Sequence, residues 1–201
     1  MSKIVKLPQP TLYTKRLLLR PITRDDANDL FEYAVDERVG PNAGWKPHSS
    51  IDESHKFIEY SIKKKEYGQP GVYAIVLQKE NKMIGTIEVH SYHGHKGEIG
   101  YVLNPKYWGN GYVPEAAKAI IIYAFEVLKL KRLQNGYFLF NDRSKRVSEK
   151  LEFIFEGILR KKYMNFNNEP LDEAILSLTD DDYYSKKLSW LEGFIIDYKA
   201  N

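Results

Sequence analysis

The sequence Tyr-Trp-Gly-Asn-Gly-Tyr-Val-Pro-Glu-Ala-Ala, residues 107–117, joins a predicted strand over 98–103 to the most apolar predicted helix of the chain, 113–128. Its two glycines, one residue apart, permit tight backbone conformations and leave no side chain to keep a ligand away. Pro114 suits the first helical position, because the missing N–H has no partner there in any case. The free N–H groups of that first turn carry the positive end of the helix dipole, so the sequence predicts a turn that holds anions, above all phosphates.

Gly-x-Gly turns between a strand and a helix also occur where nothing binds, and the spacing of Gly109 and Gly111 does not separate the two cases. Two other phosphate loops are excluded by the residues present. The segment lacks the Gly-Lys-Ser/Thr end of a P-loop, and it lacks the third glycine of the dinucleotide fingerprint. A phosphate-binding turn of another type and a purely structural turn are the interpretations that remain.

Residues 104–116, Asn-Pro-Lys-Tyr-Trp-Gly-Asn-Gly-Tyr-Val-Pro-Glu-Ala, resemble the acetyl-CoA loop of GCN5-related N-acetyltransferases (GNATs), whose pattern is Gln/Arg-x-x-Gly-x-Gly/Ala at the start of the central helix. The most similar branch contains the ribosomal-protein N-terminal acetyltransferases, in which Trp-Gly-x-Gly-Tyr and a following Glu-Ala are common. Trp108 stands where the family has Gln or Arg, and Val113 where it has Gly or Ala. Because backbone N–H groups bind the phosphates, neither departure alone removes the site. The resemblance covers roughly residues 11–184.

The order of the predicted elements indicates an α+β fold. A strand over 14–20 is followed by two helices, three antiparallel strands within 72–103, the central helix, a strand over 132–140, a short helix and a last hairpin. This order contains one strand–helix–strand crossover, from 98 to 140. The resemblance implies the matching GNAT fold, a mixed, mostly antiparallel sheet that is splayed between its fourth and fifth strands and admits the thioester into the gap.

The length of 201 residues suits a single domain over 1–201 with a sizeable core, in which 11–184 is the family-like part. Leu188, Leu191 and Ile195 lie at helical spacing, so we expect a helical C-terminal extension over 185–201. A helix that packs on the domain and a contact that makes a homodimer are both open for this segment. The absence of cysteine excludes disulfides, thiolate metal sites and cysteine nucleophiles.

Several partner classes are disfavoured by composition. No apolar run reaches about 18 residues and the first ten residues lack the apolar core of a signal peptide, so we expect a soluble, cytoplasmic protein that does not act at membranes. The net charge of +3 is too small to indicate nucleic acid by itself. An RNA-binding module, suggested by mild basicity and 13% aromatic residues, is an alternative, although no RNP-like aromatic pattern is present. His90, His93 and His95 surround a turn, but nothing else suggests metal ligands and no metal is expected.

The resemblance implies acetyl-CoA as cosubstrate and assigns its binding to three parts of the chain. Tyr101, Val102 and Leu103 would offer strand backbone groups to the pantetheine arm. Asn141 would contact CoA through its carboxamide, and a simple helix cap is the alternative role for this residue. The pyrophosphate would be held by the loop and the first helical turn, where the proline contributes position only. These expected loop residues are Trp108, Gly109, Asn110, Gly111, Tyr112, Val113 and Pro114.

The family's usual catalytic residues are missing. The Tyr that many members place seven residues after the Asn is Ser148 here, and the strand Glu found in others five residues before the Asn is Gly136. The ribosomal-protein branch has a Ser three residues after the Asn, which Ser144 matches, and an acidic partner near the position of Tyr163. We therefore expect Ser144 near the thiolate, Tyr163 as a second donor and Glu98 as a base that acts through water. The structural alternatives are an ordinary strand carboxylate for Glu98 and a helix cap for Ser144.

The predicted activity is acetyl-CoA-dependent acetylation of a primary amine, with a protein N-terminus of the ribosomal-protein type as the first acceptor considered. Such transfer requires an enzyme to align amine and carbonyl, keep the amine neutral, polarise the carbonyl and protonate the thiolate. One alternative is a small-molecule acceptor such as a polyamine, an amino sugar or an antibiotic, because acceptor loops diverge freely on one fold. The other is a non-catalytic CoA-binding protein, which the missing Tyr and Glu favour.

Overall fold

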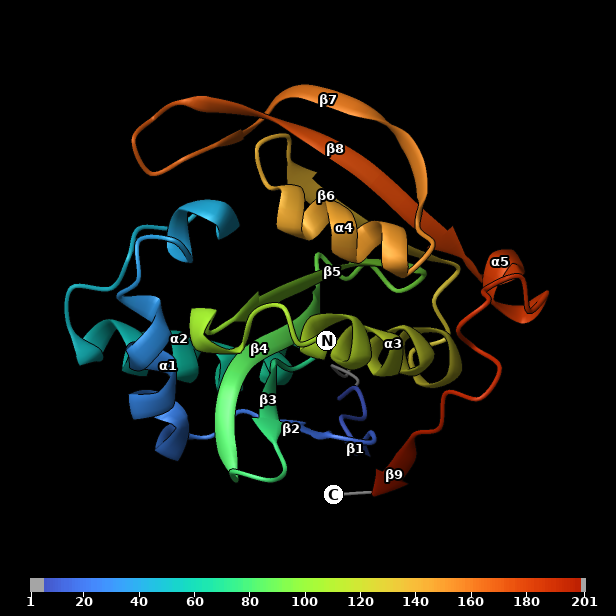
Figure 1. Ribbon diagram of the computed structural model, residues 1–201, viewed down its shortest axis with the longest axis horizontal. Helices are drawn as coiled ribbons and strands as arrows, with labels where there is room; N and C mark the ends of the chain where they lie inside the picture. Colours follow the sequence, from blue (N-terminus) through green and yellow to red (C-terminus); the bar gives the residue numbers. More distant parts are fainter. Residues whose placement is uncertain (1–5, 200–201) are drawn as a thin grey trace, which may run out of the picture.

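One sheet runs through the part of the chain that the computed structural model describes, residues 6–199, in the strand order β7-β8-β6-β5-β4-β3-β2-β1-β9 (Figure 1). The strands are β1 (Thr11–Tyr13), β2 (Leu17–Pro21), β3 (Tyr73–Leu77), β4 (Lys82–His90), β5 (Lys96–Leu103), β6 (Arg132–Phe138), β7 (Ile154–Met164), β8 (Pro170–Thr179) and β9 (Asp197–Lys199). The α-helices are α1 (Ala27–Ala34), α2 (Ile51–Lys63), α3 (Tyr112–Ile122), α4 (Asp142–Lys150) and α5 (Asp180–Tyr184). The shorter turns of helix are η1 (Arg24–Asp26), η2 (Gly40–Ala43), η3 (Lys64–Tyr67), η4 (Pro105–Tyr107) and the π-helical η5 (Tyr123–Val127). None of the described helices has the length and apolar character needed to span a membrane.

The sheet opens between β5 and β6, the one parallel pair among the described strands. These strands pair from Lys96 with Arg132 as far as Ile99 with Asn135, and their pairing does not continue beyond that point. The ends of the two strands therefore face each other without closing the ladder, which leaves backbone donors and acceptors for a ligand. The predicted α+β GNAT fold, with its splay between the strands at 98–103 and 132–140, is confirmed.

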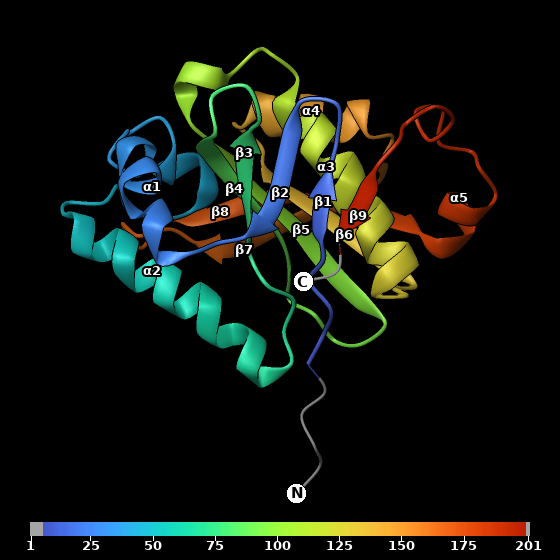
Figure 2. The same ribbon diagram turned by 90° about the horizontal axis from the view of Figure 1, so that it is seen from below.

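Helices cover both faces of this sheet (Figure 2). On one face, α3 and η5 bury the apolar side that the sequence predicts, and α4 packs against α3 and β6. On the other face, α1 and α2 pack around Ile58 and form a second core with β3 and β4. The fully buried residues of the central helix are Ala116, Ala117, Ala119, Ile120, Ile121, Ala124 and Phe125.

The C-terminal segment departs from the predicted helix. Within the described residues beyond α5 there are turns and then β9, which pairs antiparallel with β1 through Leu12 and Tyr198. Leu188 is buried beside the α3 core, whereas Ile195 at the other end of the supposed apolar stripe is 77% exposed. The helical prediction was wrong because residues 197–199 form backbone hydrogen bonds with the edge of β1 instead of continuing a helix. Gly193, with φ +82°, also has a backbone conformation that is not helical.

Candidate active site

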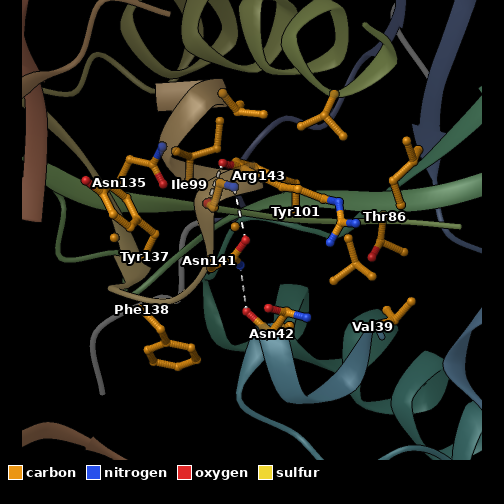
Figure 3. A pocket seen from close by; sticks show the side chains of 18 of the residues that line it. Val39, Asn42, Thr86, Ile99, Tyr101, Asn135, Tyr137, Phe138, Asn141 and Arg143 are labelled. Atoms are coloured by element: carbon orange, nitrogen blue, oxygen red, sulfur yellow. Dashed lines mark hydrogen bonds between the residues drawn. The ribbon is translucent and has the colours of Figure 1, made fainter. Parts of the chain in front are cut away.

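A cavity of about 1350 Å³ lies where β5 and β6 diverge. Figure 3 shows Tyr101, Arg143 and Asn141 around the same space, with Asn42 on the opposite wall. Of the residues expected from the sequence, the ones whose atoms line the cavity are Glu98, Tyr101, Val102, Leu103, Trp108, Gly109, Gly111, Tyr112, Val113, Pro114, Asn141, Ser144 and Tyr163. Asn110 differs, because its side-chain amide donates to the carbonyls of Tyr107 and Trp108 at 3.2 and 3.1 Å and so shapes the loop from within.

The loop before α3 has the backbone that its glycines permit. Gly109 and Gly111 have φ values of +79° and +76°, in the left-handed region that side chains disfavour. A Cβ at Gly109 would meet no atom within 4 Å, so the space beside the loop is open. α3 begins at Tyr112, one residue earlier than predicted, which makes Pro114 the third helical residue. Its missing N–H still lies in the first turn, where no intrahelical acceptor exists.

An ion pair that the sequence patterns did not indicate holds this loop in place. Glu115, in the first turn of α3, accepts hydrogen bonds from Thr14 Oγ1 and Arg16 Nε, both at 2.6 Å. Arg16 Nη1 also donates to the Asn110 carbonyl at 2.9 Å, and its guanidinium lies 4.5 Å from the centre of the Tyr112 ring. The loop is therefore tied to the β1–β2 turn before any ligand arrives. Preorganisation of this kind lowers the entropy lost on binding.

Two arginines flank Trp108, the residue that replaces the family's Gln or Arg. The guanidinium carbon of Arg143, from α4, lies 4.1 Å from the centre of the indole ring, and that of Arg38 lies 5.7 Å away. The indole Nε1 donates to the Leu103 carbonyl at 2.9 Å, which occupies one acceptor site of a strand group expected to serve pantetheine. Positive charge is thus brought beside the loop from other elements, a feature that no local pattern around residue 108 could reveal.

Asn141 is a helix cap that also connects two walls of the cavity. Its Oδ1 accepts from the Ser144 backbone N–H at 3.1 Å, and its Nδ2 donates to the Asn42 carbonyl at 3.0 Å (Figure 3). The capping alternative is therefore correct in geometry. Because one N–H of the amide and a second lone pair of the oxygen are not used in these contacts, the side chain retains the capacity to bind a ligand amide.

We expect Asn141→Ala to weaken CoA binding by about 1–3 kcal/mol, the cost of leaving a buried polar partner unsatisfied. Loss of the cap should also lower the free energy of unfolding by about 1 kcal/mol. Calorimetric titration with CoA and thermal unfolding measure the two effects separately. Thr179→Ala is a matched control, because Thr179 caps α5 through the Asp182 N–H and does not line the cavity. A lower melting temperature with an unchanged CoA dissociation constant would show that Asn141 is only a cap.

Three hydroxyl groups lie near the start of α4, and two of them belong to residues that line the cavity. Ser144 Oγ lies 2.8 Å from the Tyr101 hydroxyl, and both residues line the cavity. Burial raises the pKa of the Tyr101 phenol, so this hydroxyl stays protonated at neutral pH. Ser148, at the position of the family's Tyr, is fully buried, donates to the Ser144 carbonyl and accepts from Asn135 Nδ2. Ser148 does not line the cavity and is not a candidate acid.

The Tyr163 hydroxyl forms a hydrogen bond at one wall of the cavity. The phenol donates to the Gly44 carbonyl at 3.0 Å, and its ring packs 5.1 Å from that of Phe138, measured between ring centres. This contact joins the β7–β8 hairpin to the loop after η2. The hydroxyl proton is engaged, so the expected role as second donor would require this bond to break first.

Three carboxylates line the part of the cavity wall that the sheet forms. Glu98 accepts from Gln134 Nε2 at 3.0 Å, and Glu88 on the neighbouring strand forms an ion pair with Lys64. Glu173 on β8 also lines the cavity and is paired with Lys162, at 3.0 Å between Oε2 and Nζ. The patterns considered in the sequence did not single out Glu173, and its only local signal is a carboxylate that precedes the buried run 174–178. The other cations of the lining come from the loop 38–46 and from α4: Arg38, Lys46, Arg143, Arg146 and Lys150.

The comparisons with known proteins agree with this geometry. Residues 16–154 match the family model of the acetyltransferase (GNAT) domain. The chain is 31% identical over 171 residues to the uncharacterized N-acetyltransferase YoaA of Bacillus subtilis, which covers 84% of this chain and 96% of that protein. It is 25% identical over 150 residues to the putative ribosomal N-acetyltransferase YdaF of the same organism, with coverage of 73% and 82%. A solved GNAT-family acetyltransferase from Bacillus anthracis, 29% identical, aligns with a TM-score of 0.76 over 85% of this chain and 99% of that one.

Proposed function

The chain belongs to the GNAT family of N-acetyltransferases, and from this premise we propose that it transfers the acetyl group of acetyl-CoA to a primary amine bound in the gap between β5 and β6. The observation that carries the proposal is the cavity at that gap, which has a phosphate-binding type of turn at one end and carboxylates at the other. This arrangement of charge suits a polyanionic donor and a cationic acceptor that meet in one space.

The donor would lie along the loop and the open strand edges. The N–H groups of residues 109–113 supply the positive end of α3, and Arg143 and Arg38 add charge beside Trp108. Beyond Ile99 and Asn135, the edges of β5 and β6 that face each other are not paired, and their backbone groups suit the amide groups of the pantetheine arm. Acetyl-CoA supplies an activated thioester, so the residues of this chain need to position it, deprotonate the acceptor ammonium and protonate the departing sulfur.

We propose one role for each polar group near the reacting atoms. Glu98 accepts a proton from the acceptor ammonium through water, which leaves a neutral nitrogen free to form the C–N bond as the C–S bond breaks. The nitrogen gives up a second proton to water as the amide forms. Ser144 donates its hydroxyl proton to the departing thiolate, and Tyr101 reprotonates Ser144 across their 2.8 Å contact. Exchange with solvent moves the proton from Glu98 and restores the one on Tyr101, so the residues return to their starting states.

We expect Ser144→Ala to lower kcat by about 10²-fold, at the lower end of the range for general acids, because water can replace a lost hydroxyl in part. The CoA dissociation constant should not change, since the cap of α4 comes from Asn141. Tyr101→Phe should lower kcat less and should not add to the Ser144→Ala effect, because the two hydroxyls act in one chain. Steady-state kinetics of the two single variants and the double variant tests this assignment, and additive losses would contradict it.

For the acceptor, we propose a protein N-terminus. An α-amino group has a pKa near 8, which leaves about 10% of it neutral at pH 7, so a water-mediated carboxylate base is sufficient. The name of the relative YdaF supports this acceptor class. A small-molecule amine is the second candidate, because the contacts of Tyr163 with Gly44 and of Asn141 with Asn42 join opposite walls and narrow the entrance for a bulky chain.

The decisive experiment incubates the protein with isotope-labelled acetyl-CoA and either cell extract or a panel of purified amines and peptides, and detects acetylated products by mass. A labelled protein N-terminus supports the first acceptor class, and a labelled polyamine, amino sugar or antibiotic supports the second. Binding of CoA without any labelled product from extract or panel would instead favour the non-catalytic CoA-binding protein.

A further inference from the structure

We propose that Glu173, together with Glu98, forms the binding site for the ammonium group of the acceptor. This inference rests on the proposed acetyl transfer and goes beyond it, because it assigns acceptor recognition to a strand outside the β5–β6 gap. Glu173 lies on β8 and is only 7% exposed, next to the fully apolar pair Ala174 and Ile175. A buried carboxylate is costly unless cations or hydrogen-bond donors compensate it. Glu173 has Lys162 at its Oε2, and its Oε1 is the atom that remains for a ligand.

The two carboxylates converge on Gly136, in the strand between them. A methyl group at Gly136 would lie 1.8 Å from Glu173 Oε1 and 3.1 Å from Glu98 Oε1, so the absence of a side chain is what lets both oxygens approach this strand. The carboxyl groups reach Gly136 from β5 on one side and from β8 on the other.

The charged side chains around Gly136 have an excess of negative charge. Glu173 is paired with Lys162 through Oε2, and its other oxygen is the one directed to Gly136. Glu98 has a neutral hydrogen-bond partner, Gln134, and no ion-pair partner within residues 6–199. Two carboxylates and one ammonium therefore carry a net charge of −1 inside the cavity wall. A substrate ammonium between the Oε1 atoms of Glu98 and Glu173 would balance that charge through a charge-assisted hydrogen bond to Glu173 and a water-mediated one to Glu98.

The neighbouring carboxylate Glu88 is a weaker candidate for the same role. It forms an ion pair with Lys64, whose side chain is only 9% exposed, so its charge is already balanced inside the protein. Lys162 differs, because it lies on the exposed edge strand β7 and keeps 31% of its side chain in solvent. Lys162 can therefore adjust when a second cation approaches Glu173. The acceptor ammonium held at Gly136 would also lie beside Glu98, the proposed base.

The test measures binding of a simple ammonium ion, so it does not depend on the identity of the acceptor. Protein saturated with CoA is titrated by NMR with n-butylammonium and, separately, with the neutral isostere 1-butanol. We expect the Gly136 amide signal to shift with butylammonium and not with butanol. Glu173→Gln should weaken butylammonium binding by about 10-fold or more, as expected for loss of one charge-assisted hydrogen bond.

Two further variants make the result specific. Gly136→Ala keeps every charge but forces the Glu173 carboxylate away, so it should weaken butylammonium binding to a similar extent. Glu156→Gln is the matched control, because Glu156 is a β7 carboxylate that is paired with Arg132 outside the cavity lining, and it should bind butylammonium as the wild type does. Should Glu173→Gln not fold, Gly136→Ala carries the test alone.

Equal butylammonium dissociation constants in the wild type and in a folded Glu173→Gln or Gly136→Ala variant would overturn the inference. So would the absence of any shift at Gly136 in the wild type. Failure of the proposed function is recognised separately, by a lack of CoA binding in calorimetric titration or by a lack of acetylated product with bound acetyl-CoA. Where CoA does not bind, the ammonium titration is made on the free protein. With an acceptor from the panel, Glu173→Gln should raise KM for the amine more than it lowers kcat, and Glu173→Asp should restore part of the loss.

Discussion

Gly111→Glu is expected to abolish CoA binding while the protein remains folded. Gly111 is the residue before α3, with φ +76°, and the N–H groups of the first turn of α3 follow it. A glutamate at this position places a carboxylate and its bulk where the pyrophosphate is expected, and the carboxylate itself can bind the free N–H groups. Competition, repulsion and steric exclusion therefore act together. Calorimetric titration with CoA measures the effect.

The backbone strain of this substitution needs a control of its own. A side chain in the left-handed region costs roughly 1–3 kcal/mol, wherever it is placed. Gly94, in the β4–β5 turn, has φ +73°, a Cβ added there would meet no atom within 4 Å, and the residue does not line the cavity. Gly94→Glu should therefore lose similar stability and bind CoA as the wild type does. Wild-type affinity in folded Gly111→Glu would remove the assignment of the loop.

Glu98→Gln should lower kcat/KM by roughly 10²–10⁴ and leave CoA affinity unchanged. Typical alkyl amines are protonated at pH 7 and attack only when neutral, so the enzyme must take up a proton. Glutamine keeps the shape of Glu98, and its carbonyl can still accept from Gln134 Nε2, but it cannot take up the proton. In the variant, the acidic limb of the pH–rate profile should follow the acceptor amine instead of a protein carboxylate, so the rate should recover as pH rises and free neutral amine becomes abundant.

The pH profile separates Glu98 from its alternatives. Glu156→Gln removes a β7 carboxylate without touching the cavity lining and should keep the wild-type profile. If Glu98→Gln has wild-type kcat/KM across roughly pH 6–9, Glu98 is not the base. Proton removal would then fall to Glu173, to a chain of waters, or to an acceptor whose own amine pKa is low. The last case favours protein N-termini.

Local sequence patterns were sufficient to predict the features of this protein that depend on residues close together in the chain. The two glycines of residues 107–117 predict the left-handed loop, because only glycine adopts that backbone readily. The apolar period of the central helix predicts which side is buried, since 3.6 residues per turn place those side chains on one face. The alternation of strands and helices predicts the antiparallel meander and the one parallel crossover. The family resemblance added the expected site of acetyl transfer to these elements.

The tertiary structure alone decided what depends on contacts between distant residues. The segment beyond α5 contains an edge strand where the sequence predicted a helix, because β1 supplied hydrogen-bond partners that helical spacing cannot reveal. Arg16 reaches Glu115 across 99 positions, and Tyr163 reaches Gly44 across 119. Glu173 meets Glu98 over Gly136 only because β8 pairs with β6 and β6 with β5. Strand register sets which side chains share a face, and register follows from the packing of the whole sheet.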